Sequence, residues 1–142
     1  MPSAKSDRFI LLVEDDPADQ AIVRRALDDR GFAGQLRVAN DGREALNLLM
    51  GHGAPLPDIL LLDLNMPRVD GREVISTLRA DPRFRSLPIV ALTTSASERD
   101  VREVYELGAN SYIVKPTGID ELGRVLDTLQ LYWFGTVELP PG

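Results

Sequence analysis

The sequence predicts an α/β fold of the doubly wound type, with a five-stranded parallel sheet and helices on both faces. Five short apolar runs alternate along the chain with five segments whose apolar residues recur at helical spacing. Strands that alternate with helices of this length form parallel sheets that are covered on both sides. The pattern therefore indicates five consecutive βα units.

The strands are predicted from the apolar runs. The stretches "FILLV" and "ILLL" are continuously apolar, which is typical of strands buried on both faces, whereas "QLRVA" alternates. In chain order the predicted strands are Phe9–Val13, Gln35–Ala39, Asp58–Asp63, Pro88–Thr93 and Ser111–Val114.

The helices are predicted from apolar spacing together with start and stop signals. Asp16, Asp41 and Ser97 are each placed to accept a hydrogen bond from the first turn of a helix. Gly108 is placed to end one helix, and the Asp81-Pro82 step another. The predicted helices are Pro17–Asp29, Asp41–Met50, Gly71–Ala80, Ser97–Ala109 and Ile119–Gln130.

Length and composition limit the classes of protein. The 142 residues show no repeat or linker, so we expect one domain over residues 9–130, with a flexible N-terminus at 1–8 and a tail at 131–142. The net charge of −6 and the lack of a basic cluster argue against nucleic-acid binding. No apolar run approaches the roughly 20 residues of a membrane span. The chain contains no cysteine, which favours a cytoplasmic location.

Polar residues gather where the predicted strands end, and that edge of a parallel sheet is where ligands bind. They are Glu14, Asp15, Asp16, Asp63, Thr93, Thr94, Ser95 and Lys115. Each alone is commonly a turn or cap residue. Together, clustered carboxylates repel one another unless a cation and a lysine offset their charge, and such oxygen ligands favour Mg²⁺. A carboxylate beside Mg²⁺ and lysine can act as a nucleophile towards phosphorus, so the pattern suggests phosphoryl transfer to Asp63.

Four motifs at these strand ends carry a resemblance to a known family. "VEDDP", "LLLDLNMPRVDG", "ALTTS" and "YIVKP" together resemble the receiver domain of two-component response regulators, a flavodoxin-like fold, over residues 9–130. The resemblance implies that Asp63 accepts a phosphoryl group from a sensor histidine kinase. It implies that Glu14, Asp15, Asp63 and the backbone carbonyl of Asn65 hold Mg²⁺.

The same resemblance assigns further roles. Lys115, ahead of a cis Pro116, and Thr93 would contact the phosphoryl group, and Tyr112 would be an aromatic switch that turns inward when Thr93 moves. Asn65 and Ser95 would modulate the lifetime of the phosphoryl group. The lone histidine, His52, is interpreted as a loop residue with no catalytic role.

Only twelve residues follow Gln130, so we expect output through a protein contact or a histidine phosphotransferase and not through a DNA-binding domain. The tail places Tyr132, Trp133 and Phe134 together; they either fold back on the domain or form a homodimer interface. This tail is similar to those of the standalone regulators that partner bacterial phytochrome kinases.

Three other interpretations compete with this one. An aspartyl-phosphate phosphatase would share the Mg²⁺, aspartate and lysine chemistry, but its nucleophile follows the first strand in an Asp-x-Asp pattern. A flavin-binding module would need a phosphate loop where the acidic "EDDP" stands. A receiver fold that never takes phosphate would serve as a fixed binding module, against which the intact acid, lysine and hydroxyl set argues.

Overall fold

The computed structural model describes residues 8–51, 53–66 and 69–140. Its strands are β1 (Phe9–Val13), β2 (Gln35–Ala39), β3 (Ile59–Leu62), β4 (Ile89–Thr93) and β5 (Ser111–Val114). Its helices are α1 (Pro17–Asp29), α2 (Gly42–Met50), α3 (Gly71–Ala80), the short 3-10 helix η2 (Pro82–Phe84), α4 (Glu98–Leu107) and α5 (Ile119–Gly135).

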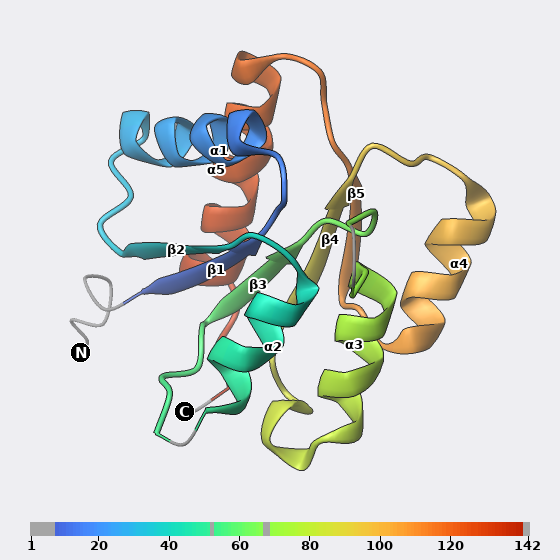
Figure 1. Ribbon diagram of the computed structural model, residues 1–142. Helices are drawn as coiled ribbons and strands as arrows, with labels where there is room; N and C mark the ends of the chain where they lie inside the picture. Colours follow the sequence, from blue (N-terminus) through green and yellow to red (C-terminus); the bar gives the residue numbers. More distant parts are fainter. Residues whose placement is uncertain (1–7, 52, 67–68, 141–142) are drawn as a thin grey trace.

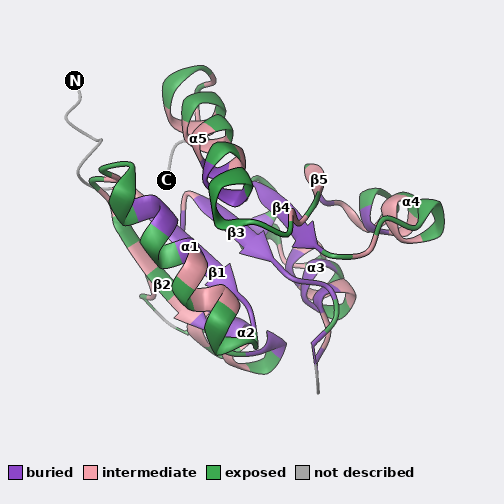
Figure 2. Cartoon of the chain, turned by 90° about the horizontal axis from the view of Figure 1, so that it is seen from above, coloured by how far each residue is buried: buried purple, intermediate pink, exposed green. Residues whose placement is uncertain are grey.

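The five strands form one parallel sheet in the order β2-β1-β3-β4-β5. Helices α1 and α5 cover one face, and α2, α3 and α4 cover the other (Figures 1 and 2). The doubly wound α/β prediction is therefore confirmed. The chain order reverses between β1 and β3, and the carboxyl ends of these two strands bound the crevice in which ligands bind in such sheets.

The two apolar layers follow from the alternation of side chains along each strand. In β1, Leu11 and Val13 face α2 and α3, whereas Ile10 and Leu12 face α1 and α5. All four are at most 4% exposed, which explains why the run is continuously apolar. The sheet is thereby held from both sides, and its carboxyl edge is a rigid platform.

The predicted helix caps are confirmed. Asp16 accepts from the N–H of Ala18, Asp41 from that of Glu44 and Ser97 from that of Asp100. Gly108 ends α4 in the left-handed region at φ 116°.

Two expectations about local structure are wrong. Helix α5 continues to Gly135 and does not end at Gln130, because Leu129 and Trp133 extend the stripe of apolar side chains that packs on the sheet. The described residues contain no cis peptide bond, so the bond before Pro116 is trans. Trans is the lower-energy form of such bonds by about 0.5–1 kcal/mol, and Lys115 in this form donates its N–H to Thr93 O at 2.7 Å.

Two expectations fall wholly or largely outside the described residues. His52 is one, and the flexible N-terminus at 1–8 is described only at Arg8. The tail at 131–142 is described as far as Pro140. No helix in the described ranges combines the length and apolar character needed to cross a membrane.

We predict that Gly108→Ala destabilises the fold by about 1–2 kcal/mol, since alanine strains a backbone at positive φ. Its Cβ would also lie 2.8 Å from Cγ of Arg79. The Arg79 guanidinium is anchored by bonds to Gly108 O (2.9 Å) and Asn110 Oδ1 (3.0 Å), so it has little freedom to move away.

The matched control is Gly51→Ala, where φ is −65° and an added Cβ would meet nothing closer than 3.7 Å. Urea unfolding should show no loss of stability for this control, and a gain of up to about 1 kcal/mol, because alanine restricts the unfolded chain. Equal stabilities of the two variants would contradict the explanation.

Candidate functional site

The candidate site lies where β1 and β3 end side by side. The N–H of Glu14 donates to Ala39 O and that of Asp63 to Val13 O, both at 3.0 Å, so the sheet's own hydrogen bonds continue into the site. Glu14 and Asp63 are only 3% and 9% exposed. Two carboxylates are thus held at a nearly buried edge.

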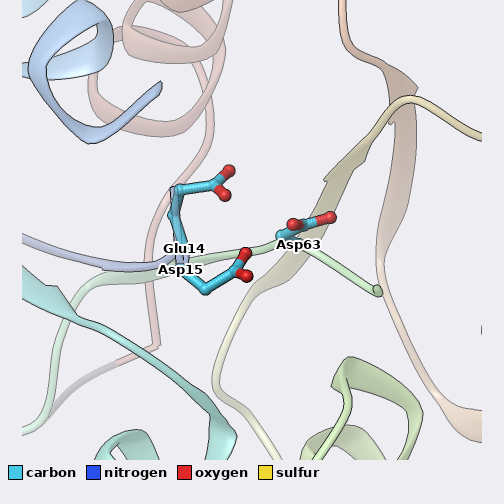
Figure 3. Close-up of side chains that lie close together, drawn as sticks. All are labelled: Glu14, Asp15 and Asp63. Carbon is cyan, nitrogen blue, oxygen red and sulfur yellow. The ribbon is translucent and has the colours of Figure 1, made fainter. Parts of the chain in front are cut away.

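Glu14, Asp15 and Asp63 form what we call the carboxylate cluster. Each offers an oxygen, and the three oxygens lie within 4.8 Å of one another. Figure 3 shows the three side chains beside each other, from the loops that follow β1 and β3. Hard oxygen ligands at this spacing fit a divalent cation such as Mg²⁺ or Mn²⁺.

The burial of Glu14 and Asp63 in the cluster disfavours negative charge on their carboxylates. Burial, with a smaller contribution from the Asp63 charge, raises the pKa of Glu14 to about 6. Burial also raises the pKa of Asp63, although the positive charge of Lys115 opposes this. Both shifts mean that the charged form of each carboxylate is disfavoured where it stands. A divalent cation would remove that penalty.

Lys115 supplies the positive charge on the other side of the site. Its ammonium donates to Glu14 Oε1 at 2.7 Å and to Asp19 Oδ2 at 3.0 Å, and its side chain is 10% exposed. Burial alone would lower the pKa of Lys115, but the bonds to these carboxylates outweigh it and raise the pKa. The lysine is therefore charged and firmly placed.

The hydroxyl side of the site lies at the end of β4. Thr93 is fully buried, and its Oγ1 accepts a weak hydrogen bond from the N–H of Ser95 at 3.5 Å. The Ser95 hydroxyl donates to Asp100 Oδ2 at 2.5 Å, and Asp100 in turn pairs with Arg72 at 2.8 Å. These contacts connect the end of β4 to the first turns of α3 and α4.

Tyr112 is half-buried on β5 and packs against the core under α4. Its hydroxyl donates to the backbone carbonyl of Ser95 at 2.8 Å, and its N–H donates to Tyr105 Oη at 3.1 Å. The Tyr112 side chain is thus bonded directly to the β4–α4 loop, so a displacement of this loop would also displace the ring. Asn65, the other residue expected to modulate the site, is exposed, and its N–H points to Asp63 Oδ1 at 3.4 Å.

The structure brings together Glu14, Asp15, Asp63 and Lys115, and it links Thr93, Ser95 and Tyr112 through hydrogen bonds. The aromatic residues of the predicted tail lie elsewhere, on α5. Sequence reasoning missed Asp19 as a partner of Lys115, and Asp100 and Arg72 as partners of Ser95. Asp19 had a usable signal, because it lies in the predicted first turn of the helix that follows the first strand, close in the chain to the acidic strand end.

The fold and the acidic edge define a class of signalling protein, and comparison with known proteins identifies it. The family described as response regulator receiver domain matches residues 10–127, and the chain belongs to this family. The membership implies a histidine kinase as partner. It also favours the receiver interpretation over the phosphatase and flavin-binding alternatives.

Individual relatives extend the match over almost the whole chain. A probable methanogenesis regulatory protein, FilR2 of Methanothrix harundinacea, is 41% identical over 135 residues, which are 93% of this chain and 87% of FilR2. The phosphorylated cyanobacterial phytochrome response regulator RcpA is 35% identical with a TM-score of 0.89, covering 95% of this chain and 99% of RcpA. The Mn²⁺-bound form of Rcp1, a response regulator of Synechocystis, is 37% identical with a TM-score of 0.85, covering 94% of this chain and 99% of Rcp1.

We predict that Asp15→Asn weakens binding of Mg²⁺ and Mn²⁺ by about tenfold or more, because it removes one anionic ligand of a site with few protein ligands. Calorimetric titration measures the change. Asp16→Asn is the matched control, since Asp16 stands next in the chain but accepts a hydrogen bond from Ala18 at 2.9 Å as a helix cap. Asparagine also serves as a cap. Equal losses of affinity in both variants would show that net charge, and not ligation, is responsible.

Proposed function

We propose that this protein is a phosphoacceptor module in which Asp63 takes a phosphoryl group from a phosphohistidine of a sensor kinase, with Mg²⁺ bound. The observation that carries the proposal is the nearly buried Asp63 carboxylate, flanked by two further carboxylates and by a charged lysine. An Asp63 oxygen forms the new bond to phosphorus. The bond from phosphorus to the histidine nitrogen breaks, and its electron pair stays on the imidazole.

The surrounding residues have defined tasks in this proposal. Glu14 and Asp15, with Asp63 and the backbone carbonyl of Asn65, hold Mg²⁺, which neutralises negative charge on the transferring group. Lys115 and Thr93 donate hydrogen bonds to the phosphoryl oxygens. The phosphoryl group survives until water attacks it, and Asn65 and Ser95 tune that lifetime. Phosphotransfer and loss of the group are the only reactions of the protein itself.

The output is a change of surface around Tyr112. After phosphorylation, the phosphoryl group places about −1.5 to −2 charge beside β3 and β4, where the free Asp63 carboxylate carried −1. Any movement of Thr93 towards this charge passes to Ser95, whose carbonyl is held by the Tyr112 hydroxyl at 2.8 Å. The local charge then shifts the equilibrium between two arrangements of α4 and β5. A downstream protein or a histidine phosphotransferase reads this surface.

We further propose a bacterial phytochrome as the kinase and the cytoplasm as the location. Support for the phytochrome comes from RcpA, a phytochrome response regulator that matches this chain over 95% of its length. We propose the cytoplasm because the kinase must contact the receiver domain in order to transfer the phosphoryl group to it.

The proposal includes a homodimer that uses the end of α5. Of the three predicted interface aromatics, Trp133 and Phe134 pack against the core, and Phe134 stacks on Phe32 with ring centroids 6.2 Å apart. Tyr132 is 49% exposed and its neighbour Leu131 is 69% exposed. We therefore place the dimer contact at Leu131 and Tyr132.

Acetyl phosphate and Mg²⁺ should add the mass of one phosphoryl group to the wild-type protein, and Asp63→Asn should abolish this gain. Intact-mass spectrometry with peptide mapping measures it. Asp28→Asn, an exposed residue on α1, controls for the change in charge and should label normally. A gain that persists in Asp63→Asn would mean that another residue is the acceptor. A wild-type protein that is never labelled would favour the fixed binding module.

Leu131→Asp should convert the dimer to a monomer, because it places a charge in a buried apolar contact. Sedimentation velocity measures the change. Leu56→Asp is the matched control, since Leu56 is also an exposed leucine, at 46%, but lies before β3. A wild-type monomer, or a dimer that survives Leu131→Asp, would contradict this interface.

A further inference from the structure

Lys115 contacts a second carboxylate, that of Asp19, in addition to the carboxylate cluster. Its ammonium has three hydrogens, and in the described part of the chain two of them are used by Glu14 and Asp19 at 2.7 and 3.0 Å. The charge of Asp63 acts on the same ammonium. The lysine is therefore shared between the carboxylate cluster on one side and helix α1 on the other.

Asp19 differs from the carboxylate cluster in position and burial. Its side chain is 33% exposed, against 4% for Glu14, and its carboxylate lies outside the group of three whose oxygens meet within 4.8 Å. It stands in the first turn of α1, where the helix N-terminus stabilises negative charge. Asp19 is thus separate from the carboxylate cluster, and it can hold the lysine whether or not a metal is bound there.

The first turn of α1 is itself fixed to the site. Asp16 caps the helix by accepting from the N–H of Ala18. The Gln20 side chain donates to the backbone carbonyl of Glu14 at 2.5 Å and to Asn40 Oδ1 at 2.9 Å. Asp19 lies between these two anchored residues, so its carboxylate is presented to Lys115 by a rigid turn and not by a free surface side chain.

We propose that Asp19 is a positioning residue that holds the Lys115 ammonium towards α1 and thereby opposes its engagement with a phosphoryl group on Asp63. The inference rests on the proposed function, because it needs Lys115 to contact that group. An incoming phosphoryl group carries about −1.5 to −2 charge and competes with Asp19 for the same hydrogens. Asp19 also repels that charge. Both effects shorten the life of the phosphorylated state.

Glu14, the other partner of Lys115, determines whether removing the Asp19 charge lengthens or shortens the lifetime of the phosphoryl group. When the Asp19 charge is removed by substitution with asparagine, Glu14 still holds the lysine, so Lys115 stays in the site. The amide oxygen of the Asp19→Asn variant is a neutral and therefore weaker acceptor, so the phosphoryl oxygens compete more successfully for the same hydrogen of Lys115, and one repulsive charge is gone. Asp19→Asn should therefore bind the phosphoryl mimic beryllofluoride more tightly and lose the phosphoryl group more slowly. We expect about threefold to fivefold for each, as for one partly exposed ion pair.

The experiment compares Asp19→Asn with Asp28→Asn, an exposed position on the same helix that makes the same change in net charge. Beryllofluoride affinity is measured by calorimetry in saturating Mg²⁺, and loss of the phosphoryl group from Asp63 is followed by intact mass. Asp28→Asn should stay within about twofold of the wild type, because an exposed charge beyond a Debye length is screened. Asp19→Glu should restore wild-type behaviour.

The same substitution made in a variant without the lysine tests whether Asp19 acts through Lys115. In Lys115→Met protein, Asp19→Asn should change the lifetime of the phosphoryl group much less than in the wild type, because only the direct repulsion between Asp19 and that group remains. An effect of the same size there, or an Asp19→Asn protein that equals Asp28→Asn or binds beryllofluoride more weakly, would overturn the inference. These outcomes leave Asp63 labelled. Failure of the proposed function is recognised separately, because the wild-type protein would then not be labelled at Asp63.

Discussion

The structure depends on one electrostatic constraint: more negative than positive charge is held at a nearly buried sheet edge. Glu14 and Asp63 pay the desolvation cost that the raised pKa values express, and Lys115 offsets only part of it. A site of this kind is poised to accept a divalent cation, and its charge balance changes again when a phosphoryl group arrives. The same excess of negative charge at the sheet edge therefore underlies the fold of the site, metal binding and signalling.

The sheet converts this imbalance into fixed geometry. Because the chain order reverses between β1 and β3, the loops after these strands diverge to opposite faces and leave the carboxylate cluster between them. Helix α3 begins close by: an added Cβ on Gly71 would lie 2.6 Å from the backbone carbonyl of Asp63. Any larger residue there would push α3 away from the acceptor, so close packing of backbone on backbone keeps the site narrow.

On the other side of the site, Ser95 is the residue through which the elements communicate. Its N–H, hydroxyl and carbonyl each contact a different partner, namely Thr93, Asp100 and Tyr112. The bond from Ser95 is the main cause that lowers the pKa of Asp100, with Arg72 adding to it, so the α4 carboxylate is firmly charged. A displacement at the end of β4 is thus transmitted to α4 and β5 by direct contacts.

Periodicity and capping signals were enough to predict the five βα units, the helix caps and the strand ends that bear Glu14, Asp63, Thr93 and Lys115, because these signals act between residues near in the chain. The folded structure was needed to show that Asp19 shares the ammonium of Lys115. It also shows that α5 continues into the aromatic residues and packs Trp133 and Phe134 on the core. Such contacts depend on how helices settle on the sheet, which is set by packing between segments distant in sequence.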